Sequence, residues 1–124
     1  MHKSRLGGFI IDCQTDDLEG ATAFWSAALG LDSRDGDEPN YVRLDGSSRD
    51  MTIEVQRVSH PSRVHLDIEC DDVEAEVARL EGLGARRLEQ IKTWVVMEAP
   101  TGQRFCVVRS KVDLSERAGA RTWK

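Results

Sequence analysis

The sequence predicts an α+β fold built from two tandem copies of one strand–helix–three-strand (βαβββ) unit. Residues 8–17 and 63–72 repeat the same order of apolar and acidic positions, and Asp67 stands fifty-five positions after Asp12. Each stretch continues into a helical pattern that ends in Leu-Gly, a common way for a helix to terminate. We therefore expect one domain over residues 1–124, with repeats at 7–58 and 63–109 and a C-terminal tail at 110–124.

The first repeat opens with a predicted strand over residues 8–15, which is rich in apolar and β-branched side chains. Alternation places Phe9, Ile11 and Cys13 on one face of this strand and Ile10, Asp12 and Gln14 on the other. Asp16 is the predicted N-cap of the following helix, and Glu19 completes a capping box. The helix is expected to end at Gly30 and to bury a stripe of Leu18, Ala21, Trp25, Ala28 and Leu29, with Phe24 also in the core.

The remaining elements follow the same periodicities. Residues 41–45 and 51–58 alternate as strands, after a polar loop at 32–40 that holds at most a short strand. The second repeat has predicted strands at 63–70, 85–90, 93–98 and 104–109, and a helix from Asp72 to Gly84. In the tail only Leu114 and Trp123 offer an anchor, so we expect it to be loose or docked on a partner.

One face of each predicted sheet is polar, although the helix covers only the other face. On the strand at 63–70, Val64, Leu66, Ile68 and Cys70 alternate with His65, Asp67 and Glu69. Glu54 and Gln56 stand beside Asp12 and Gln14 in the same way. Polar groups at this density are costly to bury without partners or water. The pattern therefore indicates a water-filled or ligand-filled cup between the two repeats.

Composition excludes several classes of function. The chain has a formal charge of −5, which gives it no general attraction for nucleic acid or an anionic membrane. No apolar run approaches the roughly 18 residues of a membrane span. Cys13, Cys70 and Cys106 show no Cys-x-x-Cys spacing, so we expect free thiols and a cytoplasmic location.

Six short motifs together resemble the small bacterial glyoxalase-like domain proteins of the vicinal-oxygen-chelate superfamily, which includes glyoxalase I, bleomycin-resistance proteins and extradiol dioxygenases. They are Ile11-Asp12-Cys13, Phe24-Trp25, Gln56-Arg57-Val58, Arg63-Val64-His65-Leu66-Asp67, Trp94-Val95-Val96-Met97 and Phe105-Cys106-Val107-Val108. The resemblance covers residues 7–109. It implies the glyoxalase/bleomycin resistance/dihydroxybiphenyl dioxygenase fold, with eight strands in a cup-shaped mixed sheet, and it implies a homodimer.

The same resemblance bears on metal binding. Metal-using members place ligands on the first and last strand of each module, and the matching positions here are Ile10, Glu54, His65 and Cys106. Isoleucine cannot bind a metal, and Cys106 stands where a glutamate is usual. We therefore expect no cofactor; if a divalent metal is bound, its ligands are His65, Glu54 and Cys106, or a set that uses Asp12 and Asp67. The alternative for His65 is a hydrogen bond to a neighbouring carboxylate in a wet cleft.

Three residues are candidates for catalysis: His65, Asp67 and Asp12. Two carboxylates in one cavity would raise the apparent pKa of the pair and support proton transfer beside a carbonyl. The simpler interpretation is that each aspartate accepts hydrogen bonds from Arg43, Arg104 or a neighbouring strand. Cys106 is either a nucleophile beside His65 or a structural thiol, and nothing in the sequence shows the lowered pKa that a nucleophile needs.

We expect a protein that binds a small organic molecule in the cup without a conventional metal site. The alternative is a metal-dependent lyase, isomerase or dioxygenase acting on a small oxygenated substrate, so whether the chain is an enzyme stays open. The predicted pocket is lined by Asp12, Gln14, Tyr41, Arg43, Glu54, Gln56, His65, Asp67, Glu69, Trp94, Arg104 and Cys106.

Overall fold

The computed structural model describes residues 1–34, 36, 38–46 and 50–124. The chain divides into two compact units. The first unit is Gly8–His65, and the second unit is Met1–Gly7 together with Leu66–Lys124. Strand β1 (His2–Gln14) and strand β4 (Arg63–Cys70) each contribute residues to both units.

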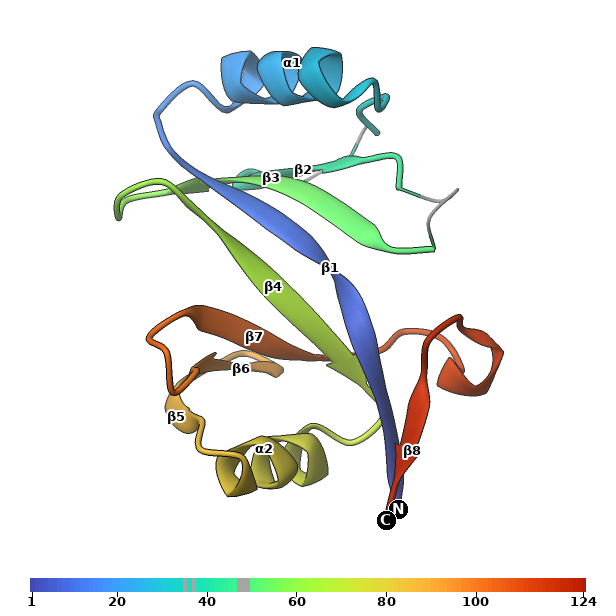
Figure 1. Cartoon of the computed structure of the whole chain (residues 1–124). Coiled ribbons are helices and arrows are strands. Elements are labelled where there is room, and N and C mark those ends of the chain that lie inside the picture. The colour runs from blue at the N-terminus through green and yellow to red at the C-terminus, as the bar shows by residue number, and fades with distance from the viewer. Residues whose placement is uncertain (35, 37, 47–49) are drawn as a thin grey trace. The chain divides into compact units, whose positions relative to one another are not determined.

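The sheet of the first unit has the strand order β2-β3-β1 (Figure 1). Strand β3 (Thr52–Val58) runs parallel to β1, from the pair Gly8–Thr52 to the pair Gln14–Val58. Strand β2 (Tyr41–Leu44) is antiparallel to β3. Because β1 and β3 are parallel, their carboxyl ends lie at the same edge of the sheet.

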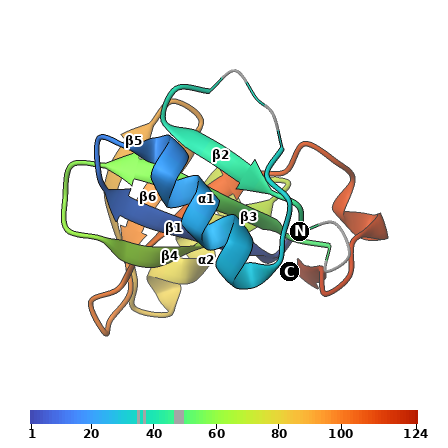
Figure 2. The same cartoon turned by 90° about the horizontal axis from the view of Figure 1, so that it is seen from above.

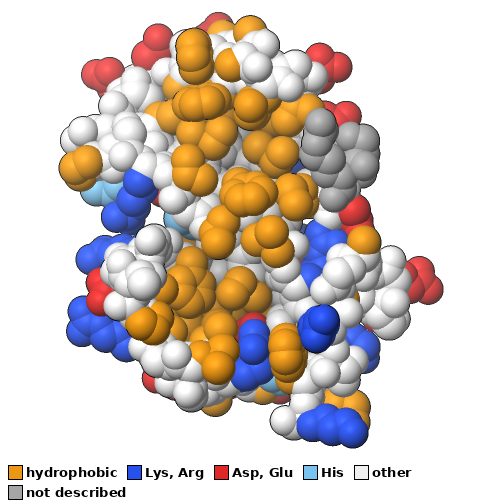
Figure 3. Space-filling model, in the orientation of Figure 1, with side chains coloured by type: hydrophobic (Ala, Val, Ile, Leu, Met, Phe, Trp, Pro, Cys, Tyr) orange, Lys and Arg blue, Asp and Glu red, His pale blue; other side chains and the backbone are white. Residues whose placement is uncertain are grey.

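Helix α1 (Leu18–Leu29) covers the apolar face of this sheet (Figure 2). Its side chains Leu18, Ala21 and Trp25 pack against a buried cluster of Leu44, Ile53 and Val55. Apolar side chains gather where α1 faces β2 and β3 (Figure 3). The predicted stripe is therefore confirmed at its first three positions.

The sheet of the second unit has the order β4-β7-β6-β5. Its further strands are β5 (Arg86–Ile91), β6 (Trp94–Glu98) and β7 (Arg104–Arg109), and helix α2 (Val73–Gly82) packs on one face. Side chains Val77 and Leu80 of α2 join a buried cluster with Cys70, Val95, Met97 and Val107. The N-cap of α2 is Asp72, whose side chain accepts a hydrogen bond from the backbone N–H of Ala75, as the sequence predicts.

The C-terminal tail docks on its own chain, so the expected loose or partner-bound tail is wrong. Strand β8 (Arg121–Trp123) pairs antiparallel with residues His2 to Ser4 of β1, and both termini lie together in Figure 1. A short 3-10 helix, η2 (Leu114–Glu116), buries Leu114, which is 2% exposed. Leu114 and Trp123 are thus the anchors of the tail, and the edge of β1 supplies the backbone hydrogen bonds.

The fold class is the one predicted, an eight-stranded mixed sheet with two helices, but several boundaries differ. Strand β1 begins at His2 instead of residue 8, because β8 pairs with its first residues. In the loop 32–40, the described residues form an isolated bridge, Ser33 with Leu44. The eighth strand is β8, in the tail.

Other local predictions were wrong by a residue or a face. The N-cap of α1 is Asp17, whose side chain accepts from the N–H of Gly20, and not Asp16. Phe24 and Leu29 are 62% and 46% exposed, because α1 has more apolar side chains than the stripe that contacts the sheet can bury. Val64 and Leu66 on β4 are 59% and 44% exposed, although we expected them on a covered face.

Candidate functional site

A polar surface covers the face of the first unit's sheet that α1 does not cover. The strand registers align Tyr41 on β2, Gln56 on β3 and Asp12 on β1 in one row. The adjacent row holds Arg43, Glu54 and Ile10. Register partners on neighbouring strands point to the same face, so these side chains lie side by side. We call them, with His65, the polar face.

The strongest contact on the polar face joins Asp12 to His65. The Nδ1 atom of His65 donates a hydrogen bond to Oδ2 of Asp12 at 2.7 Å. Asp12 is 2% exposed and the His65 side chain 13% exposed. From the sequence, one of the two interpretations of His65 was a hydrogen bond to a neighbouring carboxylate, and the structure contains this bond. A carboxylate that accepts a hydrogen bond from Nδ1–H fixes the orientation of the imidazole.

A guanidinium also approaches this carboxylate. The Nε atom of Arg63 lies 3.8 Å from Oδ2 of Asp12, and an Nη of Arg63 lies 3.2 Å from Nε2 of His60. Among the described residues, the partners of Asp12 are therefore His65 and Arg63. They belong to a neighbouring strand, which was one of the alternatives that the sequence left open, whereas the other two, Arg43 and Arg104, are not its partners. The reason is alternation along β4, which puts Arg63 and His65 on one face, next to β1.

The second carboxylate oxygen of Asp12 has no hydrogen-bond donor within the described residues. Oδ1 is buried, and no donor from the described part of the chain reaches it. An unpaired buried carboxylate oxygen costs more than a lost hydrogen bond, because ionised groups are desolvated at high cost. A donor outside the described residues, such as water or a ligand, would relieve this cost.

Tyr41 stands at the other end of the same row. Burial raises the pKa of its hydroxyl, and the negative charges of Glu54 and Glu38 raise it further, although Arg43 acts in the opposite direction. The phenol therefore stays protonated near neutral pH, and its hydroxyl donates a hydrogen bond to the Glu38 side chain. The polar face thus combines a hydrogen-bonded phenol at Tyr41 with an acceptor at Asp12.

Five predicted pocket residues belong to the second unit. Asp67 on β4 is the register partner of Cys106 on β7, and Cys106 in turn pairs with Val96 on β6. Glu69 forms an ion pair with Arg5, whose Nε lies 2.8 Å from Oε1. Trp94 begins β6, and Arg104 begins β7 opposite Glu98. Their part in ligand binding stays a prediction.

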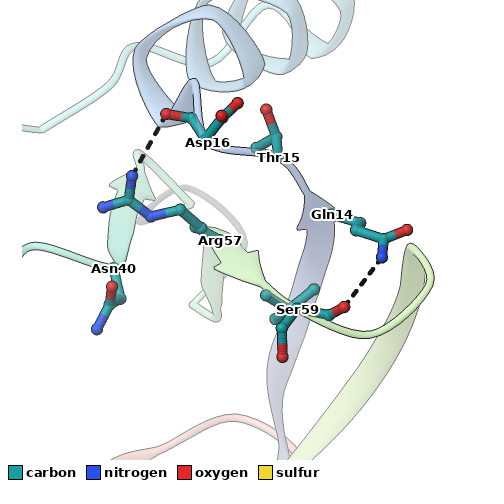
Figure 4. A pocket seen from close by; sticks show the side chains of 7 residues that line it. Gln14, Thr15, Asp16, Asn40, Arg57 and Ser59 are labelled. Carbon is teal, nitrogen blue, oxygen red and sulfur yellow. Dashed lines mark hydrogen bonds between the residues drawn. The ribbon is translucent and has the colours of Figure 1, made fainter.

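An open hollow of about 580 Å³ lies at the carboxyl ends of β1 and β3 (Figure 4). Its lining residues are Gln14, Thr15, Asp16, Asn40, Arg57, Val58 and Ser59. Gln14 is the predicted pocket residue among them, and its amide donates to the carbonyl of Ser59 at 2.9 Å. The sequence interpretation missed Arg63 and Arg57, although both fall in the quoted motifs, because each appeared there as part of a resemblance and not as a contact.

A family model described as a glyoxalase-like domain matches residues 8–108. The chain belongs to the glyoxalase-like domain family. It is thereby a member of the vicinal-oxygen-chelate superfamily, as the sequence motifs predicted. No curated protein sequence matches the chain.

Solved structures of this superfamily share the fold of the glyoxalase-like chain. Methylmalonyl-CoA epimerase from Mycobacterium tuberculosis is 14% identical, with a TM-score of 0.59 over 90% of this chain and 91% of that one. Homoprotocatechuate 2,3-dioxygenase from Arthrobacter globiformis is 20% identical, with a TM-score of 0.58 over 85% of this chain and 35% of that one. A hypothetical protein from Bacillus halodurans is 11% identical, with a TM-score of 0.61 over 89% and 96%. At these identities the likeness shows the fold alone.

Within the described ranges, no helix is long and apolar enough to cross a membrane.

Proposed function

We propose that this glyoxalase-like protein binds a small organic molecule on the polar face of its first unit, without a conventional metal site. One observation carries the proposal. Oδ1 of Asp12 is buried and receives no hydrogen bond from the described residues. A ligand that donates a hydrogen bond to this oxygen would remove a cost that the folded protein otherwise bears.

The rest of the polar face defines what such a ligand should carry. A hydroxyl or amide N–H is needed opposite Asp12, and a second such donor would suit the phenol oxygen of Tyr41, whose own proton is directed to Glu38. His65, oriented by Asp12, would take up a proton from a carbon or hydroxyl of the bound molecule. Small hydroxylated or carbonyl compounds have these features, and the polar face would suit them as ligands or as substrates.

The experiment is a titration of three probes, followed by NMR of the ¹⁵N-labelled protein. The probes are lactate, homoprotocatechuate and methylmalonyl-CoA, the last two taken from the names of structurally similar enzymes. Asp12→Asn should abolish saturable shifts, whereas Asp32→Asn, an exposed aspartate of the same unit, should leave them unchanged. Equal binding by wild type and Asp12→Asn would contradict the proposal, and so would the absence of saturable shifts with all three probes.

A metal-dependent lyase, isomerase or dioxygenase is the second candidate. It is favoured by the hydrogen bond from Nδ1 of His65 to Asp12. With Nδ1 held in this way, Nε2 is the ring nitrogen that would coordinate a metal, as in many metal-binding histidines. Glu54 lies on the polar face in register with Ile10, and Cys106 pairs in register with Asp67. Imidazole, carboxylate and thiolate donors suit zinc or iron. When bound, such an ion would act as a Lewis acid on a substrate oxygen.

Metal analysis separates the two candidates. If the preferred function holds, protein purified without a chelator should contain less than about 0.1 equivalent of metal per chain. The reason is that a tight site needs three or four ligands. Near-stoichiometric zinc or iron that is lost in His65→Ala, with an unchanged circular dichroism spectrum, would favour the metal-dependent enzyme. Incubation with zinc, iron, manganese or nickel salts extends the test to weak sites.

We further propose that the protein works as a homodimer in the cytoplasm. The exposed apolar side chains Leu6 and Leu66, each 44% exposed in the second unit, support an association surface. Sedimentation equilibrium of wild type and Leu66→Lys checks this proposal. A wild-type mass of about 14 kDa, that of one chain, would contradict it.

A further inference from the structure

The hollow at the carboxyl ends of β1 and β3 contains a positive charge, that of Arg57, which forms no ion pair with a carboxylate of the described residues. The guanidinium of Arg57 donates to the backbone carbonyl of Pro39 at 2.7 Å and to that of Asp16 at 3.5 Å. Among the described residues, no carboxylate oxygen forms an ion pair with it. The backbone carbonyls hold the side chain in place but leave its charge uncompensated, in a protein with a net charge of −5.

We propose that this hollow binds the oxyanion group of a small molecule, a carboxylate or a phosphate, through Arg57. The guanidinium has five N–H donors, and its two carbonyl partners use two of them. The N–H groups of a guanidinium lie in one plane, and two of the remaining donors can bind two oxygens of one carboxylate or phosphate group. This inference is independent of the polar face and of the function proposed for it.

Neutral polar side chains also line the hollow. They are the hydroxyls of Thr15 and Ser59 and the amide of Asn40 (Figure 4). The backbone N–H of Arg57 donates to the carbonyl of Asn40 at 2.7 Å, which holds the backbone of Asn40 next to that of Arg57. Hydroxyl and amide N–H groups are the usual second donors to a bound oxyanion.

One acidic side chain also lines the hollow. In Figure 4 the Asp16 carboxylate is turned toward Thr15, and its backbone carbonyl, not its carboxylate, receives the Arg57 bond. The guanidinium is therefore accessible to an anion from the side opposite this carboxylate. At about 580 Å³, the hollow has the size of sites that hold small metabolites. Because it is open to water, affinity for the bare ions will be weak and will depend on salt.

The test is a titration of the ¹⁵N-labelled full chain with inorganic phosphate and with acetate, at ionic strength held constant with chloride. Saturable shifts of the Thr15, Arg57 and Ser59 amides are expected with at least one of the two anions. Arg57→Gln should weaken binding by about tenfold or more, the usual effect of losing a charged hydrogen bond. Arg34→Gln is the matched control, because Arg34 is an exposed arginine of the same unit that is already paired with Asp45.

A second variant keeps the proposal testable if Arg57→Gln does not fold. Asn40→Asp retains both carbonyl bonds of Arg57 but adds a negative charge to the lining, so it should weaken anion binding by a similar factor. Stronger binding of phosphate would indicate a phosphorylated ligand, and stronger binding of acetate a carboxylic acid. The inference is overturned if neither anion gives saturable shifts beyond chloride, or if Asn40→Asp and a folded Arg57→Gln bind as tightly as wild type.

Discussion

The imidazole of His65 is held by the buried carboxylate of Asp12, with 2.7 Å between Nδ1 and Oδ2. An ionised carboxylate only accepts hydrogen bonds, so Nδ1 must carry the proton. The neutral ring is therefore the Nδ1–H tautomer, whereas the Nε2–H form usually predominates in isolated imidazole side chains. Long-range ¹H–¹⁵N NMR at about pH 8.5, above the ordinary histidine pKa, should show this directly.

Substitution of Asp12 tests that assignment. In Asp12→Ala the Nδ1–H acceptor is lost, and the Nε2–H tautomer of His65 should become the major form. His2, whose Nε2 lies 2.7 Å from Oε1 of Glu76 in the second unit, serves as the internal control and should keep its spectrum. An unchanged His65 tautomer in the variant would show that Asp12 does not position the ring.

A second carboxylate network lies in the second unit. The Glu76 side chain is fully buried and accepts hydrogen bonds from Nε2 of His2 at 2.7 Å and from Nε and Nη2 of Arg79 at 2.8 and 2.7 Å. Burial pushes the pKa of Glu76 up, but hydrogen bonds from Arg79, His2 and Ser4 outweigh it, so the pKa lies below the ordinary value of 4.5.

This network predicts an acid-sensitive stability. Because the unfolded chain has the higher pKa for Glu76, it takes up the proton first as the pH falls. The stabilisation is complete above about pH 4.5 and is lost as the pH falls through the folded-state pKa. Urea unfolding at several pH values should show this loss in wild type and a smaller one in Glu76→Gln. Glu81→Gln, at an exposed site of helix α2, which also carries Glu76, should keep the wild-type pH dependence.

The tail is fixed to this network through Trp123. The Trp123 Nε1 atom donates to Oγ of Ser4 at 2.9 Å, and Cζ of Arg79 lies 3.9 Å from the centroid of the indole ring. Trp123→Ala should lower the free energy of unfolding by about 1–3 kcal/mol, from lost packing and a lost cation–π contact. Trp123→Phe keeps an aromatic ring but not the Nε1–H donor, so it should recover part of the lost stability. A change below about 0.5 kcal/mol in Trp123→Ala, the range of ordinary surface substitutions, would mean that the tail is not a stabilising element.

Gly8 lies where β1 and β3 approach most closely. A Cβ at this position would lie 1.8 Å from the carbonyl oxygen of Thr52, its register partner. Gly8→Ala should therefore destabilise the protein by about 2–4 kcal/mol, because backbone atoms must move. Gly82→Ala is the control, since a Cβ there meets nothing within 4 Å and alanine favours the helix. Chemical denaturation compares the two, and equal stabilities would contradict the close approach.

Much of the fold follows from local patterns. Period-two alternation correctly separated the helix-covered face of β3, with Ile53 and Val55, from the polar face with Glu54 and Gln56. Helix ends were accurate within a residue, because a side-chain cap and a terminal glycine act locally. The N-cap of α1 is Asp17 and not the predicted Asp16. Either of these adjacent aspartates can cap a helix, and the point at which β1 ends determines which of them stands at the first turn.

The site could be predicted only in part. Alternation named Asp12, His65, Tyr41 and Gln56, but it could not say which of them touch. The pairing of Asp12 with His65 depends on register between strands that are far apart in sequence, and register is set by the whole sheet. For the same reason the hollow around Arg57 left no local signal, because its lining comes from three separate segments.

By itself the sequence determined the α+β class, the two-fold repeat, the family and the polar character of one sheet face, since periodicity and motifs are properties of neighbouring residues. Tertiary structure decided that Asp12 binds His65 and Arg63, that Arg57 has no carboxylate partner within the described chain, and that β8 docks on β1. Those outcomes depend on contacts between residues far apart in the sequence, such as Ser4 and Trp123, which are separated by 119 positions. Such contacts form only when the packing of both elements is complete, and no local pattern encodes them.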